Sequence, residues 1–147
     1  MLNGIKHAHS GLRWVVLALL LFAIFNAYMG WRGKKNYTSK DKKIHLFAMI
    51  AIHIQVLIGL LSYYLNLGTK VQFHNVMKND VLRFFTVEHL TMMLLALVVI
   101  TIGFSRSKKI NETPNRFRFI FITYLIGLGL ILAGIPWPFR ELGAGWF

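Results

Sequence analysis

Four long apolar runs, separated by shorter polar segments, dominate the pattern of hydrophobic and polar positions along the chain. The runs cover residues 14–31, 44–65, 84–104 and 119–135. Each approaches the length of about 20 residues that a helix needs to cross about 30 Å of hydrocarbon, at a rise of about 1.5 Å per residue. The pattern therefore predicts four transmembrane helices.

The segments between the runs are GKKNYTSKDKK, NLGTKVQFHNVMKND and SRSKKINETPNR. Connections of this length favour an antiparallel, up-down four-helix bundle. Asp41 and Asp80 suit the first turns of the second and third helices, and Pro114 suits the entry to the fourth. We therefore expect an all-α membrane protein, with residues 1–147 forming a single membrane domain and helices over approximately 8–31, 44–66, 81–105 and 116–136.

Composition narrows the class further. The chain is 56% hydrophobic, has 15% charged residues and has a mean hydropathy of +0.54, which is too apolar for an ordinary soluble domain. It has no cysteine. The absence of thiols excludes disulfides, iron–sulfur clusters and thioether-linked haem c, whereas haem b, metal–imidazole and quinone chemistry remain open.

The net charge of +12 is distributed in blocks between the apolar runs. Because no basic face results, the charge does not indicate a nucleic-acid partner, and the lipid bilayer is the expected one. The first and third connections carry eleven basic residues: Arg32, Lys34, Lys35, Lys40, Lys42, Lys43, Arg106, Lys108, Lys109, Arg116 and Arg118. The opposite face carries six: Lys6, Arg13, Lys70, Lys78, Arg83 and Arg140. This asymmetry predicts that the first face is cytoplasmic and that both termini lie outside.

Three histidines lie within or beside these apolar runs: His9, His53 and His89. A titratable ring at membrane depth is costly, so each is a candidate functional residue. Imidazole is also a common ligand of haem iron and of other metals. If two of these rings face each other inside the bundle, the simplest resulting site is a bis-histidine haem b site.

Depth in the membrane favours one pair. His9 and His89 both enter from the outer side, on the first and third helices, which are diagonal in an up-down bundle. His53 lies nearer the midplane, and with His89 it forms the alternative pair. Arg13 follows His9 by one turn and suits a haem propionate. Beside His89, Glu88 has three alternative roles: orienting a ring, binding a proton, or pairing with a basic residue such as Arg13.

Structural roles compete with ligation for each histidine. His53 can serve as a polar link between helices by bonding to a threonine or glutamine. His9 can be a surface histidine at the start of a helix, and His89 can be hydrogen-bonded across helices. His45 and His74 are expected at the two membrane interfaces, outside any site.

The segments HSGLRW, HIQVLIG, VEHLTMM and IPWPFR resemble a group of short four-helix bacterial membrane proteins labelled cytochrome b-like. The resemblance covers essentially the whole chain. It implies a haem b anchor in respiratory electron transfer in the bacterial inner membrane, with His9, His53 and His89 at the matching positions. Only three intramembrane histidines are well placed, so a single haem is expected.

Three functions follow as hypotheses. The first is a haem b electron carrier, a small subunit or anchor that works with protein partners in quinone-linked respiration. The second is a haem-free quinone or proton-relay subunit that uses Glu88, His89, His53 and Gln55. The third is a structural subunit of a larger complex. A stand-alone enzyme is not expected, because no nucleophile–base constellation is present.

Overall fold

The computed structural model describes residues 2–67 and 73–142. Four long helices dominate it: α1 (Leu2–Arg32), α2 (Ser39–Leu67), α5 (His89–Ser107) and α6 (Thr113–Gly134). The shorter elements are α3 (Phe73–Lys78), α4 (Asp80–Arg83), the π-helical turn η1 (Phe84–Glu88) and the 3-10 turn η2 (Pro138–Arg140). The described residues form no strand, so the predicted all-α class is confirmed.

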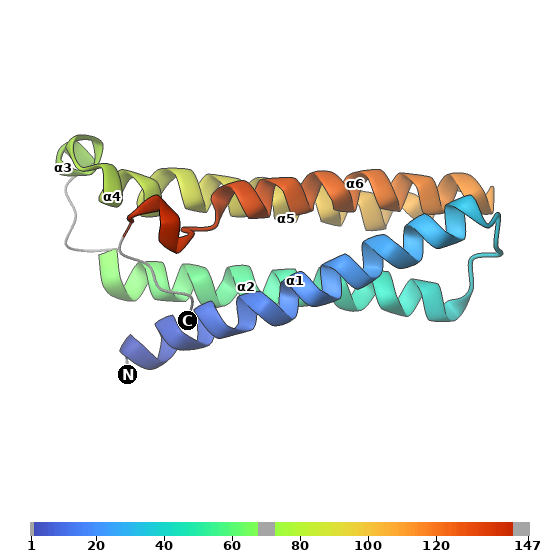
Figure 1. Cartoon of the computed structure of the whole chain (residues 1–147), viewed down its shortest axis with the longest axis horizontal. Helices are drawn as coiled ribbons and strands as arrows, with labels where there is room; N and C mark the ends of the chain where they lie inside the picture. Colours follow the sequence, from blue (N-terminus) through green and yellow to red (C-terminus); the bar gives the residue numbers. More distant parts are fainter. Residues whose placement is uncertain (1, 68–72, 143–147) are drawn as a thin grey trace.

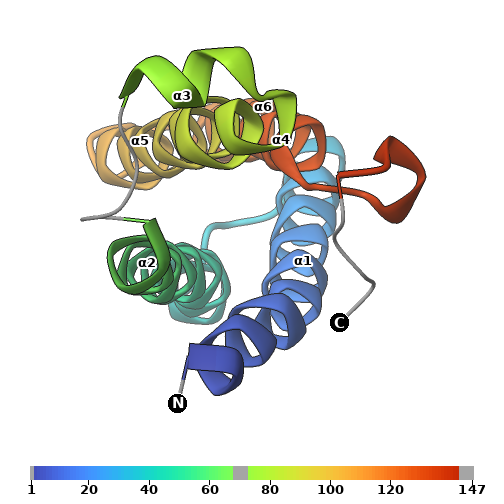
Figure 2. The same cartoon turned by 90° about the vertical axis from the view of Figure 1, so that its left-hand side faces the viewer.

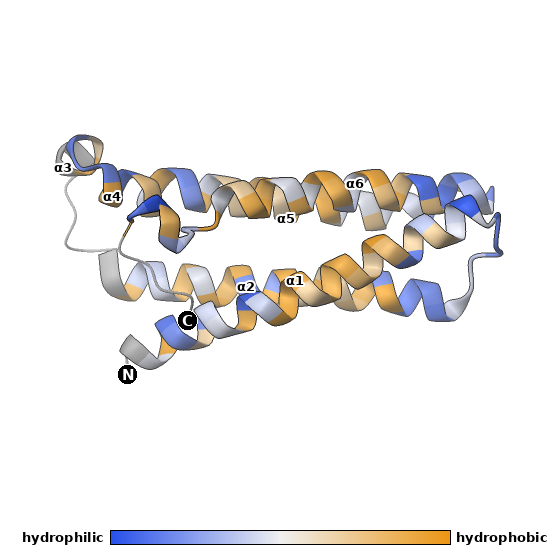
Figure 3. Ribbon diagram, in the orientation of Figure 1, coloured by the Kyte–Doolittle hydropathy of each residue, from blue (hydrophilic) through white to orange (hydrophobic). Residues whose placement is uncertain are grey.

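Four helical spans are long and apolar enough to cross a membrane, as the sequence predicted. They are Gly4–Arg32, Ser39–Leu65, Asp80–Ser107 and Thr113–Gly134. The third is composite, because α4, η1 and α5 follow one another without a break. Apolar residues occupy the middle of the spans, and polar residues gather toward their ends (Figure 3).

The helix boundaries differ from the predicted ones for local reasons. The first two helices begin earlier, at residue 2 instead of 8 and at residue 39 instead of 44, because polar turns extend them beyond the apolar runs. Asp41 accepts a hydrogen bond from the Thr38 backbone N–H at 2.8 Å, which caps the start of α2. The last helix ends at Gly134, before the predicted residue 136, since a residue that precedes proline is forced out of the helical region and Ile135 is extended.

The long helices pack in a closed order. α1 lies against α2 and α6, α5 lies against α6, and α2 completes the ring with a sparser contact to α5. Consecutive long helices run in opposite directions (Figure 1), and the end-on view shows α2 and α1 beneath the α5–α6 layer (Figure 2). We call the end where α1 begins and α6 leads into η2 the terminus end. The opposite end, with residues 33–38 and 108–112, is the basic end.

The core runs along the inside of the four helices. Its fully buried residues include Leu20, Ile100, Ile120 and Tyr124. Large apolar side chains also cover the outside, and several are more than half exposed: Leu21, Phe22, Phe25, Phe47, Leu57 and Ile126. An exposed apolar surface of this extent is typical of helices that contact lipid.

A close approach between α5 and α6 depends on Gly103. A Cβ at this position would lie 2.1 Å from Thr123 Oγ1, so no side chain fits. We expect Gly103→Leu to lower the thermal unfolding temperature of the detergent-purified protein, with an overpacking cost of about 1–3 kcal/mol or more. Gly129→Leu is the matched control, because a Cβ there meets nothing within 4 Å. Equal stability of the two variants would contradict this packing.

Candidate functional site

A cavity of about 640 Å³ lies near the terminus end, between the four long helices. Its wall includes His9 and Arg13 from α1, Gln55 and Gly59 from α2, and His89 from α5. Apolar side chains make up most of the remaining wall, among them Leu17, Ile52, Val56, Phe85, Met93 and Ile131. A mainly apolar cavity with a few polar groups is typical of a cofactor or ligand site, for which volumes of about 300–1,000 Å³ are usual.

His9 is held in place by α2. The Gln55 amide donates a hydrogen bond to the His9 backbone carbonyl at 2.8 Å. One turn further along α2, Gly59 leaves room for the imidazole, because a Cβ there would lie only 2.9 Å from His9 Cε1. Gln55 and Gly59 therefore fix the level at which the His9 ring enters the cavity.

His89 follows directly after the π-helical turn η1. Its backbone N–H bonds to the Phe84 carbonyl, five residues earlier. Such a turn inserts one extra residue into the helix, and π-helical turns occur frequently at functional sites. The His89 side chain therefore projects in a different direction from the one it would have in an uninterrupted α-helix.

The end of α6 orients the His89 ring. His89 Nδ1 lies 2.7 Å from the carbonyl oxygen of Gly134, the last residue of α6. Carbonyls in the last turn of a helix lack a partner within the helix, so this one is available to accept. Nδ1 must donate this bond, and Nε2 then carries the lone pair. Histidines that bind metals commonly have this arrangement.

The two imidazoles meet at the cavity. The ring centres of His9 and His89 lie 6.2 Å apart, with an angle of 81° between the ring planes. A metal ion held in line between two imidazoles separates their ring centres by about 6 Å, because each metal–nitrogen bond is about 2.0 Å long and each nitrogen lies about 1 Å from its ring centre. The ring-centre separation of His9 and His89 is thus close to the value that two imidazoles bound to one metal ion would have.

Arg13 supplies positive charge beside the pair. It lies one turn after His9 on α1, on the cavity wall, with its guanidinium 5.3 Å from the centre of the Trp14 ring. Lys6 and Ser10 line the same side of the cavity. A guanidinium at this position can bind a carboxylate of a ligand with two parallel hydrogen bonds.

His53 does not share this environment. Its Nδ1 lies 2.8 Å from the Met49 carbonyl oxygen, and its Nε2 lies 3.4 Å from the Thr101 hydroxyl on α5. It is not part of the cavity wall. The structure thus brings His9 and His89 together, whereas His53 links α2 to α5 through the kind of polar contact that the sequence offered as its structural role.

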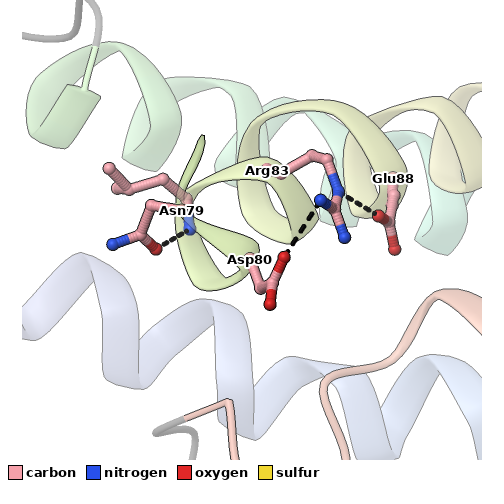
Figure 4. Close-up of polar contacts among 5 residues, drawn as sticks. Asn79, Asp80, Arg83 and Glu88 are labelled. Carbon is pink, nitrogen blue, oxygen red and sulfur yellow. Dashed lines mark hydrogen bonds and ion pairs between the residues drawn. The ribbon is translucent and has the colours of Figure 1, made fainter. Parts of the chain in front are cut away.

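Glu88 is engaged in an ion pair on the outside of the bundle. Its carboxylate lies 3.1 Å from Arg83 Nε, and the Arg83 guanidinium also reaches Asp80 at 3.0 Å (Figure 4). Asn79 caps the same turn by accepting the Leu82 N–H. Of the three alternatives for Glu88, pairing is therefore the one seen, with Arg83 in place of Arg13.

The predicted interfacial level of His45 stays a prediction; the structure shows that its ring is completely buried at the basic end. Tyr37 folds over it, with 3.0 Å between the phenol oxygen and His45 Nδ1. Burial raises the pKa of Tyr37 to about 12, so the phenol keeps its proton. Tyr124 donates to the His45 backbone carbonyl at 2.8 Å. The prediction for His74 concerns a side chain outside those that the structure describes.

The sequence did not single out Gly59 as part of the site, it gave Gln55 no role beside His9, and it treated Gly134 only as a small residue that permits close packing on the last helix. Their roles arise from contacts between helices, and residue spacing along one helix carries no signal of them. Within the described residues, no group of three or more histidine, cysteine or acidic side chains gathers to hold a metal ion. The candidate site is therefore a pair of imidazoles at a cavity.

No protein-family model, curated protein or solved structure matches this chain.

Proposed function

We propose that this protein is a membrane-embedded haem b electron carrier in which His9 and His89 would hold the haem iron. The observation that carries the proposal is the approach of the two rings to 6.2 Å at the wall of a mainly apolar cavity. When bound, haem b supplies reversible one-electron chemistry at its iron.

The surrounding residues have separate tasks in this proposal. The Gly134 carbonyl fixes the tautomer of His89 and makes Nε2 a better electron donor. Gly59 leaves space for the His9 ring, and Arg13 binds a propionate at the polar side of the cavity. Apolar walls exclude water, which influences the reduction potential.

Charge supports an orientation for the protein. We propose an up-down bundle with the basic end in the cytoplasm and the terminus end outside, because ten of the eleven basic residues at the basic end are exposed. The haem then lies near the outer face of a bacterial inner membrane. Electron transfer at that level requires a donor and an acceptor, which we propose to be a quinol and a protein partner of the respiratory chain.

The proposal is tested by the cofactor content of the protein. Protein purified in mild detergent from a haem-replete host is expected to contain about one haem b per chain, measured as its pyridine adduct. Its reduced-minus-oxidised absorption spectrum is expected to be of the b type. A colourless preparation that is folded and monodisperse would overturn the proposal.

A haem-free quinone or proton-relay subunit is the second candidate, and one observation favours it. Gln55 Oε1 and His9 Nδ1 are buried and have no hydrogen-bond partner among the described residues. Both residues line the cavity, where a quinol hydroxyl could donate to them. In this case a quinone analogue binds with an affinity that depends on Gln55, and no haem absorption band is present.

A further inference from the structure

We propose that a second, open pocket on the surface of α5 and α6 binds the headgroup of a quinone or quinol. The inference rests on the proposed electron-transfer function and adds to it the site at which the quinone or quinol binds. The pocket has a volume of about 400 Å³ and lies beside the π-helical turn η1. Phe84, Val87 and Met92 give it apolar walls, and Glu88 and Arg140 also line it.

The two charged residues are close enough to line one pocket, but no ion pair joins them within the described part of the chain. Glu88 uses one carboxylate oxygen for Arg83. Arg140 donates from Nη1 to the Ala133 carbonyl at 2.9 Å, and its guanidinium lies 4.8 Å from the centre of the Phe84 ring. Glu88 therefore retains an acceptor and Arg140 retains donors for a ligand between them.

This combination suits a headgroup that changes between acceptor and donor. A quinone carbonyl accepts hydrogen bonds and a quinol hydroxyl donates them, whereas a guanidinium only donates and a carboxylate only accepts. An anionic lipid phosphate matches less well, because Glu88 would repel its charge. The position of Glu88 also points to a ligand, since acidic residues within membrane-spanning segments are costly and commonly mark functional sites.

The pocket lies directly beside the histidine pair. Gly134 forms part of its wall, and the carbonyl of the same residue binds His89 Nδ1 at 2.7 Å. Phe84 also forms part of the wall, and its ring centre lies 6.2 Å from that of His89. A redox-active headgroup in the pocket is thus separated from His89 by a single layer of side chain and backbone.

The test measures the binding of a short-chain ubiquinone and of a short-chain menaquinone analogue to the intact protein in phosphatidylcholine nanodiscs. Quenching of tryptophan fluorescence reports the binding. We expect saturable binding of at least one analogue. Glu88→Gln and Arg140→Gln should each weaken it about tenfold, the effect of losing one charge-assisted hydrogen bond. Ala133→Phe should block the pocket, and Leu132→Phe is the matched control on the neighbouring exposed position. Absence of binding, or equal binding by all four variants, would overturn the proposal.

An anionic lipid in the same pocket gives a different pattern. Native mass spectrometry with phosphatidylglycerol would then show weaker lipid retention in Arg140→Gln and stronger retention in Glu88→Gln, and this pattern without quinone binding overturns the inference. The haem spectrum separates the two proposals. If the protein has its haem absorption band but binds no quinone, only the proposed quinone pocket is contradicted. If colourless protein binds quinone saturably, the quinone pocket is supported and the haem proposal is contradicted.

Discussion

His89→Ala and His9→Ala are each expected to lower the haem content of the purified protein by more than about tenfold, because each removes one axial ligand. The structure makes the two changes comparable, since both rings lie at the same cavity with their centres 6.2 Å apart. The measurement is haem per chain from the pyridine adduct, together with the reduced-minus-oxidised spectrum.

His53→Ala is the matched control, because the same side chain is removed from a ring that is not on the cavity wall. This variant should keep its haem and lose only a contact of about 0.6 kcal/mol between helices. Addition of imidazole should restore the spectrum of His89→Ala, since the free ring fills the vacated position. Loss of haem in His53→Ala together with retention in His89→Ala would contradict the assignment.

Gly59→Leu is expected to remove the haem spectrum about as completely as His9→Ala does, although it leaves both histidines in place. A Cβ at residue 59 would lie 2.9 Å from His9 Cε1, and a leucine side chain would occupy the space of the ring itself. The His9 ring must then shift from the position that it has beside His89. The measurement is again haem per chain, combined with circular dichroism to show that the helices are retained.

Gly11→Leu provides the control for this change, because a Cβ at residue 11 meets nothing within 4 Å. Its haem content should equal that of the unmodified protein. If Gly59→Leu also keeps its full haem content and an unchanged spectrum, His9 is not held where the structure places it, and the role of α2 in supporting the site is wrong.

The four spans and the approach of His9 to His89 could be predicted because both depend on distances along the chain. The length of each apolar run fixes each span, and counting residues from the run ends places these two rings at similar depth. The predicted up-down order puts the first and third helices on a diagonal, where inward-facing rings would meet. Distances along the chain did not predict how closely each pair of helices packs. In particular, they did not predict that α2 contacts α5 more sparsely than the other neighbouring helices contact one another.

The details that give the site its chemistry could not be predicted in this way. The π-helical turn before His89 forms because the His89 N–H bonds to the carbonyl five residues earlier instead of four. No residue type in FFTVE predicts this acceptor. The bond to Gly134 joins residues 45 positions apart. The burial of His45 requires Tyr37, in a loop, and Tyr124, on another helix, to close over it. In each case the decisive contact is tertiary.

In the proposed site, His9 and His89 hold one iron ion between them. Electron paramagnetic resonance of the oxidised, purified protein tests this claim most directly, because the signal reports the number and kind of axial ligands. We expect the low-spin ferric signal of two imidazole ligands, and we expect it to be converted to a high-spin signal or lost in both His9→Ala and His89→Ala. A high-spin signal in the unmodified protein, or a low-spin signal that survives both replacements, would contradict it.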